Sequence, residues 1–216
     1  MQTAYHLYGQ LRAGGGSPEQ VEAALTVAKD VHEVKKEYFQ IVRGISEALE
    51  GETDGDCMDL GELVHILGES TRRTAAAEGR QVAFTSACAD ALSLRQHHYL
   101  MSIFRNLLNN AVEAAPEGRT AHLALTERTE GQTLVFTVTD DCGGIPPQHL
   151  AQIFLPGFSS KINFTTGEVN RGLGLTIVKE LVEDRLQGEI AVTCENGGTA
   201  FTLRFPREQL TREEED

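Results

Sequence analysis

FTVTDDCGGIPPQHLAQIFLPGFSSKINFTTGEVNRGLGLTIV, residues 136–178, contains two glycine clusters on either side of a segment with little apolar periodicity. The first cluster, CGG at 142–144, follows an alternating apolar run that predicts a half-buried strand. The second, GLG at 172–174, opens an apolar-periodic helix. Glycines before a helix let backbone amides approach an anion, and the helix amino end adds unpaired N–H groups and a positive dipole. Two such places indicate a nucleotide site, although glycines before a helix can also be a simple turn.

The composition of the whole chain narrows the classes of protein. The 216 residues suit one or two domains, and the net charge of −13 argues against nucleic acid as the main partner. No apolar run approaches the ~18 residues of a membrane-spanning helix, and the amino terminus lacks the pattern of a secretion signal. The four cysteines lie far apart without a CxxC pair, which argues against a zinc site or a disulfide framework. We therefore expect a cytoplasmic location.

The amino-terminal part of the chain predicts a helical hairpin. Ser17 and Gln20 form the capping-box pattern of a helix start, and apolar residues then recur every three or four positions. This pattern predicts a helix over residues 17–50, and a second helical pattern covers residues 58–79. Since two antiparallel helices bury their apolar stripes incompletely, we expect dimerisation into a four-helix bundle. The predicted domain is 1–80.

The remainder of the chain, 81–216, predicts a second domain with strands and helices. A strongly apolar helix is expected at 98–115 and another at 172–186. Short strands are expected at 82–84, 120–126, 132–139, 188–194 and 199–205. The fold class is therefore α+β, a helical hairpin followed by an α/β sandwich with a mixed, mostly antiparallel sheet and helices on one face.

The 98–115 helix carries three asparagines, Asn106, Asn109 and Asn110. Asn106 and Asn110 are four residues apart and share one face of the helix. Asparagine is a middling helix former, so this cluster indicates either a polar cavity or an ordinary solvated face. A carboxamide oxygen can hold Mg²⁺ beside phosphate oxygens.

Five segments of this region resemble the motifs of the GHKL ATPases, which include bacterial sensor histidine kinases. RNLLNNAVEAAP resembles the N box, DDCGGIPP the G1 box, IFLPGFSSK the F box and NRGLGLTIVKELVE the G2 box. ENGGTAFTLRFP resembles the closing hairpin of the family, and all five follow in the family's order. The resemblance implies a Bergerat ATP-binding fold, with ATP and Mg²⁺ as cofactors.

The resemblance also implies roles for individual residues. Asn110 would ligate Mg²⁺, and Asn106 would line the same phosphate site. Asp140 would accept a hydrogen bond from the adenine amine, and Gly144 would let the backbone approach the adenine. The phosphate side would also include Lys161, Arg171, Gly172, Leu173, Gly174 and Leu175.

Three positions depart from the family's usual pattern. Cys142 replaces the first glycine of the G1 box, which leaves open how closely the backbone there approaches a ligand. Asn170 replaces the first glycine of the G2 box, and Glu113 stands where many kinases have lysine.

DVHEVKKEYFQIVRGI, residues 30–45, resembles the H box of histidine kinases. His32 would be the nucleophile, since a neutral imidazole with a pKa of ~6.5 can attack a phosphoryl group near neutral pH. Glu33 would accept or orient the proton of the ring. Lys36 occupies the place of the asparagine or threonine that the family associates with dephosphorylation, so a phosphatase activity stays open.

The sequence as a whole predicts ATP-dependent autophosphorylation on His32, followed by transfer to an aspartate of a response-regulator receiver domain. We expect a homodimer, with no nucleic-acid partner and membrane association only through a sensor region outside this chain. Two alternatives stay open: a GHKL protein-serine kinase of the anti-sigma type, and a phosphotransfer scaffold with weak nucleotide turnover.

Overall fold

The computed structural model describes residues 17–18, 20–27, 57–88, 92–158 and 172–211, and it divides the chain into two units, Met1–Gly55 and Asp56–Asp216. In the first unit, residues 18 and 20–27 are helical. The Ser17 amide donates to the Gln20 Oε1 at 3.0 Å, and the Gln20 amide donates to the Ser17 Oγ at 3.3 Å. These reciprocal bonds satisfy two amides at the helix start, so the predicted capping box is confirmed.

The second unit is built on a five-stranded mixed sheet in the order β2-β4-β5-β7-β6. Strand β2 runs parallel to β4, and the other neighbours are antiparallel, so the predicted mixed, mostly antiparallel sheet is confirmed. The strands are β2 (Val82–Cys88), β4 (Ala121–Glu130), β5 (Thr133–Asp140), β6 (Glu189–Glu195) and β7 (Gly198–Pro206). A separate antiparallel pair joins β1 (Met58–Asp59) to β3 (Ser93–Leu94).

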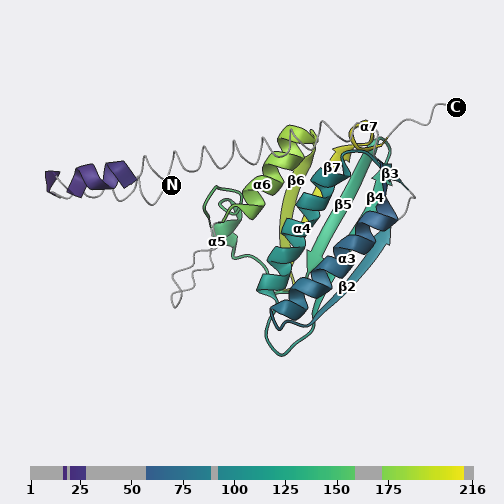
Figure 1. Ribbon diagram of the computed structural model, residues 1–216, viewed down its shortest axis with the longest axis horizontal. Coiled ribbons are helices and arrows are strands. Elements are labelled where there is room, and N and C mark those ends of the chain that lie inside the picture. The colour runs from purple at the N-terminus through teal and green to yellow at the C-terminus, as the bar shows by residue number, and fades with distance from the viewer. Residues whose placement is uncertain (1–16, 19, 28–56, 89–91, 159–171, 212–216) are drawn as a thin grey trace. The chain divides into compact units, whose positions relative to one another are not determined.

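Helices cover one face of this sheet (Figure 1). They are α3 (Leu60–Ala77), α4 (His97–Ala114) and α6 (Gly174–Glu180), and α6 continues into the π-helical turn η1 (Leu181–Arg185). The short helices α5 (Pro147–Leu150) and α7 (Arg207–Leu210) complete the unit. The core lies between the helices and the sheet, where alternate strand residues such as Leu123 and Phe136 meet Phe104 of α4, and all three are buried.

The structure corrects the predicted domain boundary at residue 80. Leu60, Leu63 and Leu67 of α3 are at most 1% exposed, and α3 packs against α4 and β2. The apolar stripe of 58–79 is therefore buried in the second unit and is not free to complete an amino-terminal hairpin. Helical periodicity predicts that a stripe is covered, but it does not identify the covering element. The boundary falls between Gly55 and Asp56.

Most of the predicted helix 17–50, with His32 and Glu33, lies outside the described residues. In the part of the chain that the structure describes, no helix combines the length and the apolarity needed to cross a bilayer.

Candidate functional site

Helix α4 presents its asparagines at the edge of the core. Asn106 and Asn110 are half-buried, while Leu107 and Leu108 between them are buried. The Asn106 Nδ2 donates to the Ser102 carbonyl at 2.8 Å, which leaves the Oδ1 as an acceptor. A Cβ placed on Gly174 would lie 3.0 Å from that Oδ1. The glycine at the start of α6 therefore lets the two elements meet at Asn106, and this contact joins the N-box segment to the second glycine cluster.

Gly172 fixes the approach of the chain to α6. Its φ is +58°, and a Cβ there would lie 2.2 Å from the Phe158 carbonyl oxygen. The Gly157 amide donates to the Gly172 carbonyl at 3.2 Å. The first N–H groups of a helix have no intrahelical acceptor, and no side chain among the described residues caps the start of α6 at Leu173. Such groups are suited to an anion such as a phosphate.

Asp140 ends β5 at the first glycine cluster. Burial raises the pKa of its carboxyl group, and hydrogen bonds from the Cys142 amide and from the hydroxyl and amide of Thr199 oppose that rise. The bond from the Cys142 amide to the Asp140 Oδ1 is 2.9 Å long. Because a carboxylate has about four acceptor positions, Asp140 can also accept a donor from a ligand.

The loop after Asp140 lies against the turn between β6 and β7. Gly143 and Gly144 have φ of +102° and +73°, and the Gly143 amide donates to the Gly197 carbonyl at 2.7 Å. A Cβ on Gly198 would lie 2.3 Å from the Asp140 carbonyl oxygen, so that glycine is required for close packing.

Cys142 is compatible with this loop although the family usually has glycine at the position. Among the described non-glycine residues, positive φ occurs at Gln96, Gln187 and Asn196 only, so the backbone at Cys142 does not require glycine. Burial and the neighbouring carboxylates Asp140 and Asp141 raise the pKa of its thiol to about 11. The group at this position is therefore a neutral thiol near pH 7.

Two features of the site were missed by the reasoning from sequence. Thr199 of β7 donates hydrogen bonds to the Asp140 carboxylate from its hydroxyl and its amide. The only feature of the sequence that could have pointed to Thr199 is its place in the closing-hairpin motif. Arg119 binds Asp141, with its Nη1 donating to Oδ2 and its Nη2 to the carbonyl oxygen, both at 2.7 Å. The His122 amide donates to the Asp141 Oδ1 at 2.9 Å. These contacts join residues 19 to 59 positions apart, beyond the reach of any local pattern.

The structure thus brings together several of the predicted site residues. Asn106 meets Gly174, and Asn110 lies one turn further along α4, which packs against α6. Gly172, Leu173, Gly174 and Leu175 are consecutive and half-buried at the start of α6, and Asp140 and Gly144 share the loop at the end of β5. His32, Glu33, Lys161 and Arg171 lie outside the described residues.

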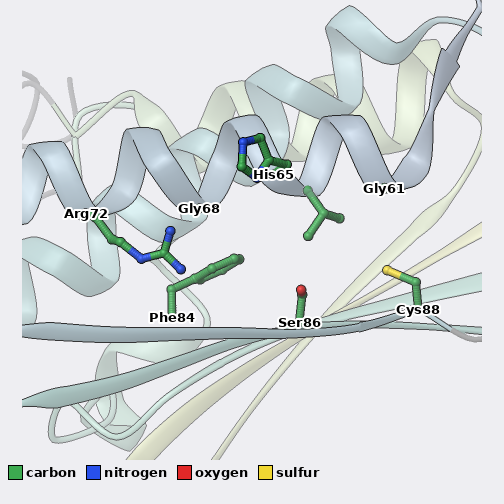
Figure 2. A pocket seen from close by; sticks show the side chains of 8 residues that line it. Gly61, His65, Gly68, Arg72, Phe84, Ser86 and Cys88 are labelled. Carbon is green, nitrogen blue, oxygen red and sulfur yellow. The ribbon is translucent and has the colours of Figure 1, made fainter.

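A separate pocket of about 350 Å³ lies between α3 and the edge strand β2 (Figure 2). Its lining includes Phe84, Arg72 and His65, and it contains none of the predicted nucleotide residues. The side chains of Ser86 and Cys88 point into it from the strand. Its lining lacks the pairing of asparagine and glycine found between α4 and α6.

Comparison with known proteins identifies one family model. Residues 96–209 match the model described as histidine kinase-, DNA gyrase B- and HSP90-like ATPase. The matched segment contains Asn106, Asn110, Asp140 and both glycine clusters.

Curated relatives of the chain include a sensor histidine kinase and a sporulation kinase. The chain is 30% identical to the sensor histidine kinase GlnK of Bacillus subtilis over 207 residues, which cover 96% of this chain and 49% of GlnK. It is 37% identical to sporulation kinase A of B. subtilis over 109 residues, covering 50% of this chain and 16% of that protein. The chain therefore spans half or less of the length of these relatives.

Solved structures share the fold of the second unit. The catalytic domain of the histidine kinase ThkA superposes with a TM-score of 0.56 at 22% identity, covering 71% of this chain and 99% of that domain. Full-length ShkA, solved in complex with AMPPNP, gives a TM-score of 0.56 at 25% identity and covers 70% of this chain and 30% of ShkA.

Proposed function

The chain belongs to the family of histidine kinase-, DNA gyrase B- and HSP90-like ATPases, and from that premise we propose that it is the phosphoryl-transferring part of a sensor histidine kinase. The observation that carries the proposal is the contact between Asn106 and Gly174, which unites an asparagine helix with a glycine-opened helix start. Together with Asp140 at the other glycine cluster, this gives separate groups suited to the phosphates and to the base.

The polar groups of the site fit an adenine nucleotide and a divalent cation. Asp140 accepts a hydrogen bond from the adenine amine, the backbone at Gly144 lies beside the base, and the amides at the start of α6 bind phosphate oxygens. Asn110 offers a hard oxygen ligand of the kind that Mg²⁺ prefers, and Asn106 lines the same phosphate site. When bound, Mg²⁺ neutralises charge that develops on the transferred phosphoryl group. Binding of AMPPNP by ShkA, a relative in fold, supports this assignment.

His32 accepts the γ-phosphoryl group in the proposed reaction. A neutral ring nitrogen forms the N–P bond, the bond between the γ-phosphorus and the bridging oxygen breaks, and ADP leaves. Glu33 accepts the proton that the other ring nitrogen gives up or orients that nitrogen. Because the similarity to GlnK covers 96% of this chain, it extends through most of Met1–Gly55, the unit that contains His32.

The phosphoryl group then passes to an aspartate of a response-regulator receiver domain. We propose that the protein acts as a homodimer and that Met1–Gly55 provides the dimer contact, since residues 58–79 are buried in the second unit. The similarity to GlnK, a sensor histidine kinase, supports both the receiver-domain partner and the homodimer.

Incubation with Mg²⁺ and γ-labelled ATP tests the proposal. We expect acid-labile label on the wild-type chain and none on His32→Gln or on Asn110→Ala, with all three proteins giving the same circular dichroism spectrum. Acid-stable label on the wild type would favour the protein-serine kinase. Acid-labile label that persists in His32→Gln would exclude His32 as the acceptor.

A further inference from the structure

The residue after the first glycine cluster is tied to the far edge of the sheet. The Ile145 amide donates to the Sγ of Cys194, on β6, at 3.3 Å. A Cβ on Gly144 would lie 3.7 Å from the Cys194 Cβ, an ordinary van der Waals separation. Cys194 therefore supports two consecutive residues of the loop, one by a hydrogen bond and one by contact.

The strand register places Cys194 in line with Asp140. Asp140 of β5 pairs with Thr199 of β7, and Thr199 pairs with Cys194 of β6. Directly paired residues of neighbouring strands have their side chains on the same face of a sheet, so all three share one face. Thr199 hydrogen-bonds the Asp140 carboxylate, and Cys194 holds the loop that follows it. One row of side chains thus supports both the carboxylate and the loop.

The loop Cys142–Ile145 is held at three amides. The Cys142 amide donates to Asp140 and the Gly143 amide to the Gly197 carbonyl, while the Ile145 amide donates to the thiol of Cys194. The Gly143 bond joins two backbones, so a side-chain substitution leaves it in place. The bond to Cys194 depends on a single sulfur atom, in a residue that is half-buried.

We propose that Cys194 is a positioning residue of the nucleotide site, whose sulfur holds the loop Cys142–Ile145 in the shape that lets a base lie beside Gly144. This inference rests on the proposed function, because the loop is a binding element only if the site takes a nucleotide. The residue acts through the loop and does not itself contact the reacting atoms. Alkylation of the thiol adds bulk beneath Gly144, so it also weakens binding.

Substitutions at Cys194 separate the hydrogen bond from the packing. Alanine keeps the Cβ that faces Gly144 and removes the acceptor, whereas serine keeps an acceptor. One neutral hydrogen bond corresponds to about a three- to tenfold change in affinity. We therefore expect Cys194→Ala to raise the Kd for ADP about three- to tenfold in isothermal titration of the full chain. We expect Cys194→Ser to stay within about twofold of the wild type, because a hydroxyl oxygen also accepts an N–H.

Thr193→Ala provides the matched control, since Thr193 is exposed and alternates to the opposite face of β6. It should bind ADP as the wild type does. Hydrogen exchange measured without nucleotide should show faster exchange of the Ile145 amide in Cys194→Ala than in Cys194→Ser.

Three results would overturn the positioning role. If Cys194→Ala binds ADP as tightly as the wild type, the hydrogen bond does not position the loop. Cys194→Ser binding as weakly as Cys194→Ala would mean that the thiol acts through packing. A wild-type chain that binds no ADP would overturn the proposed function itself, and the positioning role with it.

Discussion

The two glycine clusters look alike in the sequence, yet the structure uses them for different physical reasons. At the first cluster, Gly143 has a φ of +102°, and a Cβ there would meet no atom of the described residues within 4 Å. At the second, Gly172 has a positive φ and also faces the Phe158 carbonyl oxygen, while Gly174 has no positive φ but touches Asn106. Glycine sets the direction of the chain at 142–144 and allows close approach at 172–174.

This difference matches the separate roles that we propose for the two clusters, one in binding the base and the other in binding the phosphates. The first cluster belongs to the base side, where Asp140, Thr199 and Cys194 hold a loop in one shape. The second belongs to the phosphate side, where α6 must start close to α4 so that amides and carboxamides converge. Substitutions should therefore have different consequences at the two clusters.

The largest effect is expected for Gly172→Ala. The methyl group combines an unfavourable φ with a 2.2 Å approach to a backbone oxygen, so the chain must shift. We expect the free energy of unfolding to fall by about 2–5 kcal/mol in urea denaturation, together with loss of nucleotide binding. Gly143→Ala is the matched control, because it carries the strain of a positive φ without a clash and should cost about 1–2 kcal/mol. Equal losses at both positions would contradict the comparison.

The next largest effect is a loss of ADP affinity in Asp140→Asn. Replacing the carboxylate removes a charged acceptor, which corresponds to about a ten- to hundredfold loss of ADP affinity. Asp141→Asn serves as control, since that carboxylate already binds Arg119 and the His122 amide. The expected change in Asp141→Asn is less than about twofold. An unchanged Kd in Asp140→Asn would remove Asp140 from the base side.

A smaller effect is expected for Gly174→Ala. Its methyl group would press on the Asn106 Oδ1 at 3.0 Å, while alanine is a better helix former than glycine. The free energy of unfolding should change by less than about 1 kcal/mol, whereas the rate of labelling from Mg·ATP should fall by up to about tenfold. Loss of stability without loss of labelling would indicate that the contact with Asn106 is only structural.

The smallest effect concerns the pH dependence of stability. The hydrogen bond from the His122 amide, helped by Arg119, lowers the pKa of Asp141. The ionised group therefore stabilises the fold above the unfolded pKa of about 4, and this contribution is lost as the pH falls through the lower folded pKa. Both partners are partly exposed, so wild type and Asp141→Asn should differ by less than about 1 kcal/mol at pH 7. The difference should shrink in acid; a constant difference would exclude this cause.

The sequence predicted the features that local patterns encode. Alternation predicted β4, β5 and β7, three- and four-residue spacing predicted α3 and α4, and Ser17 with Gln20 predicted a capped helix start. Asn106 and Gly174 were both predicted as site residues, and the structure brings them into contact.

The features that depend on register or on packing partners could not be predicted in this way. Thr199 and Cys194 join the site because β7 and β6 pair in one register beside β5. The predicted domain boundary at residue 80 was wrong for the same reason. The apolar face of α3 could be buried equally well by a second helix or by the sheet, and its sequence pattern does not distinguish the two. Local periodicity shows which residues are buried, and long-range pairing decides what buries them.

The affinity for ADP with and without Mg²⁺, measured for wild type, Asp140→Asn and Asn110→Ala, tests the assignment of the two clusters most directly. Asp140 is assigned to the base, so its substitution should weaken ADP binding by the same factor in both conditions. Asn110 is assigned to the cation, so its substitution should weaken binding only when Mg²⁺ is present. Equal losses for Asn110→Ala with and without Mg²⁺, or a loss for Asp140→Asn confined to Mg²⁺, would contradict the account.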